Sequence, residues 1–154
     1  MLLSDLLPAS AIAVGVTAAD KRAVFDRAGA IIGPPLGVSP RAVARTLADR
    51  EALGSTGFGG GCAIPHGRMA GLTQMHAAVL RLAKPLDWQA LDGLAVELVV
   101  VLLGPADAGV EHLKALALVS RLLRDRARVA RMLGAADAGA LLASLADGPD
   151  IVAA

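Results

Sequence analysis

The chain has 154 residues, a length typical of one domain, and 55% of its residues are hydrophobic. Its 15 Lys and Arg residues and 14 Asp and Glu residues give a formal net charge of +1. The high hydrophobic fraction excludes intrinsic disorder, and the balanced charge with only 2% aromatic residues argues against a nucleic-acid partner. We therefore expect a single folded domain over residues 1–154.

The chain carries no feature of a membrane or secreted protein. Its strongest apolar run, Leu98–Leu103, is far shorter than the ~20 residues that cross a bilayer. The N-terminus lacks the basic region of a signal peptide, and Asp5 interrupts its apolar stretch. Because Cys62 is the only cysteine, no intrachain disulfide can form. These features predict a cytoplasmic protein without membrane insertion.

The first expected helix covers residues 18–32. Thr17-Ala-Ala-Asp20 has the form of a capping box, and apolar residues follow it at helical spacing. Gly33-Pro34-Pro35 should end this helix, because neither proline can donate a helical N–H.

A second helix is expected over residues 40–53, followed by a loop. Ser39 suits the N-cap, and the fixed φ of Pro40 suits the first helical position. Five of the eight residues in 54–61 are glycine, which predicts a loop whose free amides can hold a phosphoryl group. The loop lacks the Gly-Lys-Ser/Thr ending of a nucleotide-binding P-loop.

The rest of the chain mixes strand and helix patterns. The run at residues 96–103 is continuous rather than alternating, as in a central strand covered on both faces. Other strands are expected at residues 11–14, 62–64 and 77–82, and helices at residues 109–125, 126–133 and 137–146. This pattern predicts an α/β domain with a mixed β-sheet sandwiched by helices.

Three histidines are candidates for chemistry. His66 lies between Pro65 and Gly67, an arrangement that presents one imidazole beside the glycine-rich loop but also fits a simple turn at a strand end. His112 lies in the first turn of an expected helix, where a partly exposed polar residue is the ordinary alternative. His76 precedes a strand and is expected to be a surface or strand-edge residue.

The spacing of these residues predicts no metal and no cofactor. The histidines stand 10 and 36 residues apart, without the paired spacing or the cysteine cluster of a zinc site. Cys62 precedes His66 by four residues, which leaves open a Cys–His nucleophilic pair. A lone cysteine is more often a small buried hydrophobe.

The segment from Arg50 to Gly67, with its Gly-Ser-Thr-Gly and Ile-Pro-His-Gly elements, resembles the signature of the fructose/mannitol-type enzyme IIA of the bacterial phosphotransferase system. Pro85–Gly93, and Pro105-Ala-Asp followed by Glu111-His112-Leu113, are similar to later segments of that family. The resemblance covers nearly the whole chain and is especially close to the nitrogen-regulatory branch. It implies a small α/β domain with a mixed sheet between helices, which agrees with the expectation above.

The resemblance implies that His66 is the phosphorylated nucleophile and that Arg50 and His112 flank the phosphoryl group. Neutral imidazole suits this role because its ordinary pKa is about 6.5, and the planar guanidinium of arginine pairs with two phosphoryl oxygens. The phosphoryl cradle would be completed by Ser55, Thr56, Gly57 and Gly67.

The function implied is that of a phosphocarrier, with a phospho-HPr or NPr-type protein as donor and a IIB protein or regulated target proteins downstream. Because Met1–Ala154 leaves no room for fused HPr, IIB or IIC domains, we favour the nitrogen-regulatory branch. A sugar-uptake IIA that donates to a fructose- or mannitol-type IIB is the first alternative. A binding module without phosphotransfer is the second.

A basic stretch near the C-terminus has no role in this scheme. It places five arginines in eleven residues: Arg121, Arg124, Arg126, Arg128 and Arg131. If a helix continued through Asp125, four of the five would share one face. We expect a solvated surface with buried stems, and partner docking is the alternative.

Overall fold

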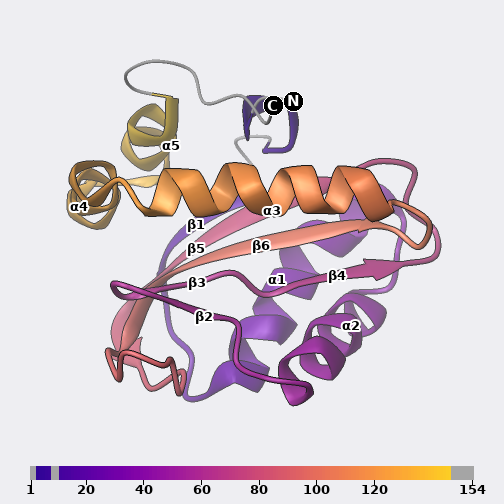
Figure 1. Ribbon diagram of the computed structural model, residues 1–154, viewed down its shortest axis with the longest axis horizontal. Helices are drawn as coiled ribbons and strands as arrows, with labels where there is room; N and C mark the ends of the chain where they lie inside the picture. Colours follow the sequence, from indigo (N-terminus) through magenta and orange to yellow (C-terminus); the bar gives the residue numbers. More distant parts are fainter. Residues whose placement is uncertain (1–2, 8–10, 147–154) are drawn as a thin grey trace.

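A mixed six-stranded sheet between helices forms the framework of the computed structural model, which describes residues 3–7 and 11–146 (Figure 1). The strands are β1 (Ile12–Val16), β2 (Gly57–Gly59), β3 (Cys62–Ala63), β4 (His66–Met69), β5 (His76–Leu86) and β6 (Val96–Pro105). The helices are the 3₁₀ helix η1 (Leu3–Asp5), α1 (Lys21–Leu36), α2 (Pro40–Ala52), α3 (Gly109–Leu123), α4 (Arg126–Gly134) and α5 (Ala138–Ala146). Helices α1 and α2 cover one side of the sheet, and α3, continued by α4 and α5, covers the other. The expected fold class is confirmed.

Strand β6 is the centre of the sheet, whose strand order is β1-β5-β6-β3-β2. It pairs antiparallel with β5 along one edge and parallel with both β3 and β4 along the other. Every residue from Leu98 to Leu103 is buried, because helices lie on both faces. The expectation of a doubly covered central strand is confirmed, although β6 extends to Pro105.

The glycine-rich segment was expected to be a loop, but it also contains the first strand of a short β-hairpin. Gly57–Gly59 forms β2, which pairs antiparallel with Cys62–Ala63. The turn between the two strands uses Gly60 and Gly61 at φ values of +64° and +84°, a region that favours glycine. The glycines therefore permit a tight reversal here instead of leaving the segment irregular.

The predicted end of the first helix is wrong. Helix α1 begins at Lys21, with Asp20 rather than Thr17 as its N-cap, and it continues through both prolines to Leu36. The prolines lie in the last turn, and Gly37 then closes the helix at φ +69° with its N–H directed to the Gly33 and Pro34 carbonyls. The left-handed glycine cap, and not the first proline, therefore marks the end of the helix.

The second helix agrees with its prediction. Ser39 caps α2 by accepting a hydrogen bond from the Ala42 N–H at 3.3 Å, and Pro40 occupies the first helical position. The helix ends at Ala52, close to the expected boundary.

The basic stretch does not form one helical face. Helix α3 ends at Leu123, and Asp125 is the N-cap of α4, accepting from the Arg128 N–H. The helix axis therefore breaks within the stretch, and Arg128 is buried rather than solvated. Its guanidinium donates to the Leu145 carbonyl, which ties α4 to α5. The expected helices at 126–133 and 137–146 are confirmed as α4 and α5.

Two glycines let α1 approach the start of α2 backbone to backbone. A Cβ at Gly29 would lie 2.3 Å from the Pro40 carbonyl oxygen, and one at Gly33 would lie 2.7 Å from the Val38 oxygen. Both obstacles are main-chain atoms that no rotamer change can move. This close packing fixes the position of α2, whose last turn carries Arg50.

Substitution of Gly29 with alanine tests this packing. We expect Gly29→Ala to lower the free energy of unfolding by about 2 kcal/mol, because the two helices must separate. Gly139→Ala is the matched control, since its Cβ would lie an ordinary 3.5 Å from Asp137 Oδ1 and alanine favours a helix. Urea unfolding of both variants measures the effect. Equal midpoints for the two variants would contradict the tight crossing.

Candidate functional site

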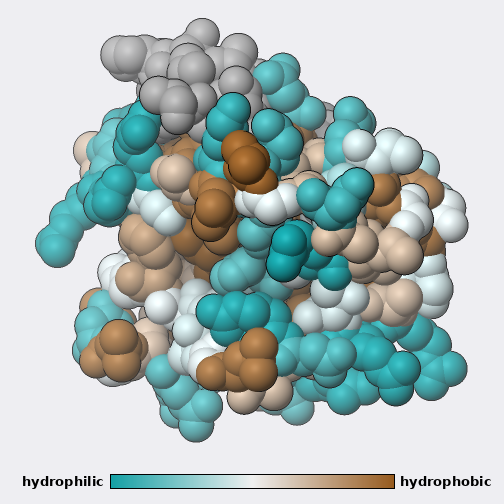
Figure 2. All heavy atoms as spheres, turned by 45° about the vertical axis from the view of Figure 1, so that its right-hand side comes forward, coloured by the Kyte–Doolittle hydropathy of each residue, from teal (hydrophilic) through white to brown (hydrophobic). Residues whose placement is uncertain are grey.

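A cleft of about 860 Å³ opens between the end of α2, strand β4 and the start of α3. Figure 2 turns this side of the molecule toward the reader and shows small hydrophobic patches among hydrophilic side chains. Four of the predicted site residues line the cleft: Arg50, His66, Gly67 and His112. Its wall also includes Thr46, Asp49, Leu53, Arg68, Val110 and Leu113.

His66 is the first residue of β4 and is held there by a hydrogen bond to its own backbone segment. The ring Nδ1 lies 2.8 Å from the Ile64 carbonyl oxygen. A carbonyl oxygen only accepts, so Nδ1 carries the proton and the neutral ring keeps its lone pair on Nε2. The geometry thereby selects Nε2 as the nucleophilic atom.

The surroundings of His66 keep its ring neutral. Burial lowers the pKa of His66, and the Arg50 charge lowers it further, while the Ile64 carbonyl and the Glu51 carboxylate oppose them. The balance is a pKa below the ordinary 6.5, so the ring carries a nucleophilic lone pair at neutral pH.

His112 faces His66 from the first turn of α3. The two ring centroids are 5.4 Å apart and the rings are tilted by 50°. His112 is buried, and its Nδ1 has no hydrogen-bond partner among the residues that the structure describes. Burial, together with the nearby His66 and Arg68, lowers the pKa of His112 to about 4. The cleft therefore contains two neutral imidazoles at pH 7.

Arg50 occupies the last turn of α2, beside the glycine-rich segment. One guanidinium nitrogen, Nη1, donates to the Gly54 carbonyl at 2.9 Å. This bond satisfies a carbonyl just beyond the helix end and restrains the side chain at the cleft wall. Since its charge lowers the pKa of His66, the guanidinium acts electrostatically on that ring.

The predicted cradle residues Ser55, Thr56 and Gly57 are not brought to the cleft wall. Ser55 Oγ donates to the Trp88 carbonyl and accepts from the Gly57 N–H, both at 3.1 Å. Thr56 is buried; its hydroxyl donates to Glu51 and accepts from the Trp88 Nε1–H at 3.2 Å. These groups instead hold the glycine-rich segment against the loop that carries Trp88.

Glu51 is a site-supporting residue that sequence reasoning missed. Its carboxylate accepts from the Thr56 N–H at 3.1 Å and pairs with Lys21 Nζ at 2.8 Å. It thus joins the start of α1, the end of α2 and the glycine-rich segment in one partly buried network. The available signal was an acidic residue at a helix C-terminus, where the macrodipole disfavours negative charge unless a partner compensates it.

Gly67 contributes space rather than a polar group. A Cβ at this position would lie 2.5 Å from Thr46 Cγ2 on α2. Only glycine allows β4 to lie this close to α2, so Gly67 brings His66 and Arg50 to one cleft.

The other candidate residues lie apart from this chemistry. Cys62 is buried, and burial raises the pKa of its thiol to about 11, which disfavours the Cys–His nucleophilic pair. His76 begins β5 and does not line the cleft. Within residues 3–7 and 11–146, no three His, Cys, Asp or Glu side chains are grouped so that they could hold a metal ion.

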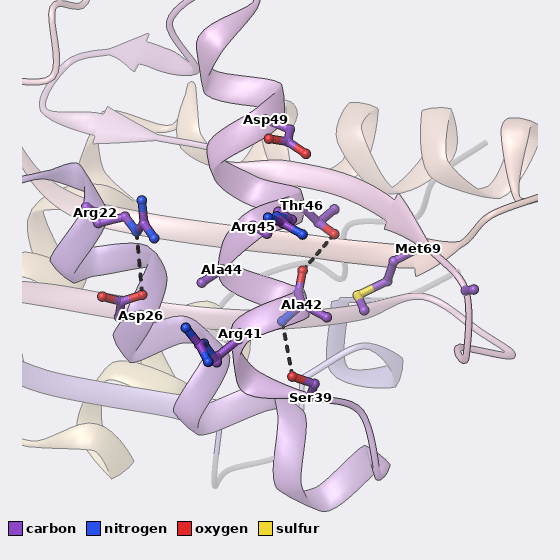
Figure 3. A pocket seen from close by; sticks show the side chains of 11 residues that line it. Arg22, Asp26, Ser39, Arg41, Ala42, Ala44, Arg45, Thr46, Asp49 and Met69 are labelled. Carbon is purple, nitrogen blue, oxygen red and sulfur yellow. Dashed lines mark hydrogen bonds and ion pairs between the residues drawn. The ribbon is translucent and has the colours of Figure 1, made fainter.

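A second groove of about 670 Å³ adjoins the cleft along α2, and Thr46 and Asp49 line both (Figure 3). Arg41 and Arg45 project from α2 into this groove, and Arg22 pairs with Asp26 at 3.9 Å. The groove lacks His66 and His112, so it is separate from the imidazole pair.

Comparison with known proteins identifies the family. Residues 5–148 match the family described as phosphoenolpyruvate-dependent sugar phosphotransferase system, EIIA 2, and the chain belongs to it. A nitrogen regulatory protein of Bradyrhizobium diazoefficiens is 38% identical over 146 residues, 95% of each chain. The crystal structure of nitrogen regulatory protein IIA-Ntr from Neisseria meningitidis is similar with a TM-score of 0.87 and 34% identity, over 93% of this chain and 98% of that one.

A relative from sugar transport also matches. The PTS system 2-O-alpha-mannosyl-D-glycerate-specific EIIABC component of Escherichia coli strain K12 is 44% identical over 101 residues. That match covers 64% of this chain and 15% of the relative. The chain thus belongs to the EIIA 2 family of the phosphotransferase system and is similar both to nitrogen regulatory proteins and to a sugar-specific member. None of its described helices combines the length and apolar character needed to span a bilayer.

Thr56→Val tests the supporting network. The substitution keeps the shape of the side chain but leaves the Glu51 carboxylate and the Trp88 N–H without their hydroxyl partner. We expect the free energy of unfolding to fall by about 1–3 kcal/mol. Thr56→Ser, which restores the hydroxyl, should recover most of it in urea unfolding. A valine variant as stable as the parent would show that the network contributes nothing.

The lowered pKa of His112 predicts acid destabilisation. Between pH 6.5, its ordinary pKa, and about 4, the unfolded chain binds a proton at His112 that the folded chain does not. The free energy of unfolding therefore falls as the pH drops through this window. His112→Gln should reduce the loss, measured as the change in urea midpoint between pH 7 and pH 5. An undiminished loss would mean that His112 is not held neutral.

Proposed function

We propose that this chain is a nitrogen-regulatory phosphocarrier that accepts a phosphoryl group on His66 Nε2 from an HPr- or NPr-type phosphoprotein. The observation that carries the proposal is the 2.8 Å contact between His66 Nδ1 and the Ile64 carbonyl, which leaves the Nε2 lone pair available. Two further observations support the proposal: Arg50 and His112 line the same cleft as His66, and the His66 and His112 ring centroids are 5.4 Å apart. Family membership supports the same chemistry.

In the transfer step, the Nε2 lone pair forms the bond to phosphorus. The bond between phosphorus and the donor's leaving group breaks, and its electron pair remains with the donor. The Nδ1 proton stays on the ring, bound to the Ile64 carbonyl, so the phosphorylated ring keeps a formal positive charge. When the bond between Nε2 and phosphorus breaks again, its electron pair returns to the ring, which leaves as a neutral imidazole, so the phosphoryl group stays transferable to a downstream protein.

Arg50 and His112 stabilise the negative charge that develops on the phosphoryl oxygens during transfer. Transfer concentrates negative charge on three equatorial oxygens, and donors already in place stabilise it without reorganisation. The guanidinium of Arg50 is always charged, and its Gly54 contact occupies one of five N–H donors. His112 is neutral at pH 7, so one ring nitrogen carries a proton to donate.

The regulatory assignment rests on the comparisons. Two relatives that are more than 30% identical and are matched over more than nine tenths of both chains are nitrogen regulatory proteins. The 44% identity to a sugar-specific component favours a second candidate, a IIA that donates to a IIB domain in sugar uptake. The two functions share the first phosphorylation step and differ in the acceptor.

Labelling in a reconstituted phosphorelay tests the proposal. The full chain is incubated with radiolabelled phosphoenolpyruvate, enzyme I and HPr, and in parallel with NPr and the enzyme I-type protein that phosphorylates it. We expect one acid-labile phosphoryl group per chain, mapped to His66. His66→Ala should take no label, and His76→Ala, outside the cleft, should be labelled like the parent.

Urea unfolding first establishes that both variants are folded. Label on a folded His66→Ala chain would refute the site, and no label on the parent from either donor would favour the binding module. Transfer of the label to a fructose- or mannitol-type IIB protein would favour sugar uptake over regulation.

A further inference from the structure

The cleft contains a second arginine that neither the sequence pattern nor the comparisons assign a role. Arg68 lies in β4, two residues after His66, and lines the same cleft. Alternate residues of a strand point to the same face and are roughly 6.6 Å apart along it. His66 and Arg68 therefore project to the same side of the sheet.

Gly67 identifies which side this is. Its missing side chain would point at Thr46 on α2, so its two neighbours point away from α2. On that side the His66 ring meets His112 of α3. The positive charge of Arg68 also acts on His112, whose pKa it lowers. Two independent observations thus direct Arg68 toward the imidazole pair.

The two cleft arginines differ in how they are engaged. Arg50 donates to the Gly54 carbonyl at 2.9 Å, which restrains it at the end of α2. Arg68 is exposed and makes no hydrogen bond or ion pair with any residue of the described part of the chain. All five of its N–H donors are available to an anion in the cleft.

The net charge of the cleft favours an anionic ligand for the Arg68 guanidinium. The charged side chains in the cleft wall are Arg50, Arg68 and Asp49. With both histidines neutral, these groups carry one net positive charge before transfer. A phosphoryl dianion on a cationic His66 ring cancels that net charge and concentrates negative charge on its oxygens, and a planar guanidinium pairs with two of these oxygens.

We propose that Arg68 is a second phosphoryl-binding residue, whose guanidinium donates to the equatorial oxygens of the group carried on His66 Nε2. The inference rests on the proposed function. Arg50 reaches the group from the α2 side and Arg68 from β4, so the two guanidiniums contact it from different walls of the cleft. Arg68 takes no part in bond making; it stabilises the oxygens while the donor bond breaks and the bond to Nε2 forms.

The test compares Arg68→Gln with Arg45→Gln. Arg45 is an exposed arginine of α2 in the neighbouring groove, so its replacement removes the same charge outside the cleft (Figure 3). The rate of labelling is measured over a range of phosphodonor concentrations. We expect Arg68→Gln to lower the maximal rate at least about tenfold, since a charged donor to the transition state is lost. Arg45→Gln should stay within about twofold of the parent.

Two further measurements separate phosphoryl binding from donor docking. Arg68→Lys keeps the charge without the planar pair of donors, and it should recover only part of the rate. Phosphorus NMR of the phosphorylated chain should show a higher pKa for the phosphoryl group in Arg68→Gln than in Arg45→Gln, because the stabilising cation is gone.

A higher half-saturating donor concentration at an unchanged maximal rate would overturn the proposal in favour of docking. A phosphoryl pKa equal in the two glutamine variants would also overturn it. Because these experiments use the parent's own labelling as reference, failure of the parent to label His66 refutes the proposed function. Normal labelling with no Arg68 effect refutes only this inference.

Discussion

The hydrogen bond between His66 Nδ1 and the Ile64 carbonyl is the interaction on which the site depends. It assigns the two ring nitrogens different tasks, because one holds a proton and the other keeps a lone pair. Pro65, between donor and acceptor, fixes the local backbone, and Leu102 N–H donates to its carbonyl at 3.0 Å. The ring is thus oriented by a segment that is hydrogen-bonded to the central strand β6. Its Nε2 lone pair is held in one orientation before a donor binds.

The remaining parts of the fold bring donors to that lone pair. Gly29 lets α1 and α2 cross at backbone contact, and Gly67 lets α2 lie against β4, so that Arg50 and His66 line one cleft. On the other side of the sheet, α3 starts beside β4 and supplies His112. Glu51 then joins α1, α2 and the glycine-rich segment in one network. The site is therefore a meeting point of both helical layers.

Features set by nearby residues could be predicted from the sequence, and features set by distant partners could not. The continuous apolar run of β6 and the Ser39-Pro40 start of α2 are local patterns, and both agree with the structure. The predicted end of α1 at Gly33 is wrong because Pro34 and Pro35 fit its last turn and Gly37 supplies the left-handed cap. Thr56 was expected at the phosphoryl group, yet its partners Glu51 and Trp88 come from other segments. Gly57–Gly59 forms a strand only because β3 is there to pair with it.

The electrostatics of the cleft connect its chemistry with regulation. Burial lowers the pKa of His66 and of His112, so both rings are neutral at pH 7. The charged side chains of the cleft wall then carry one net positive charge, which attracts a phosphoryl dianion. In the proposed phosphorylated state, the phosphoryl dianion on a cationic His66 ring cancels the net positive charge of the cleft wall, while the surrounding apolar side chains Leu53, Val110 and Leu113 stay exposed. A target protein that contacts this rim would meet a net positive cleft in one state and a cleft without net charge in the other, beside the same apolar surface. Discrimination between the states then needs no change of fold, since a like charge placed opposite a partner costs binding energy directly.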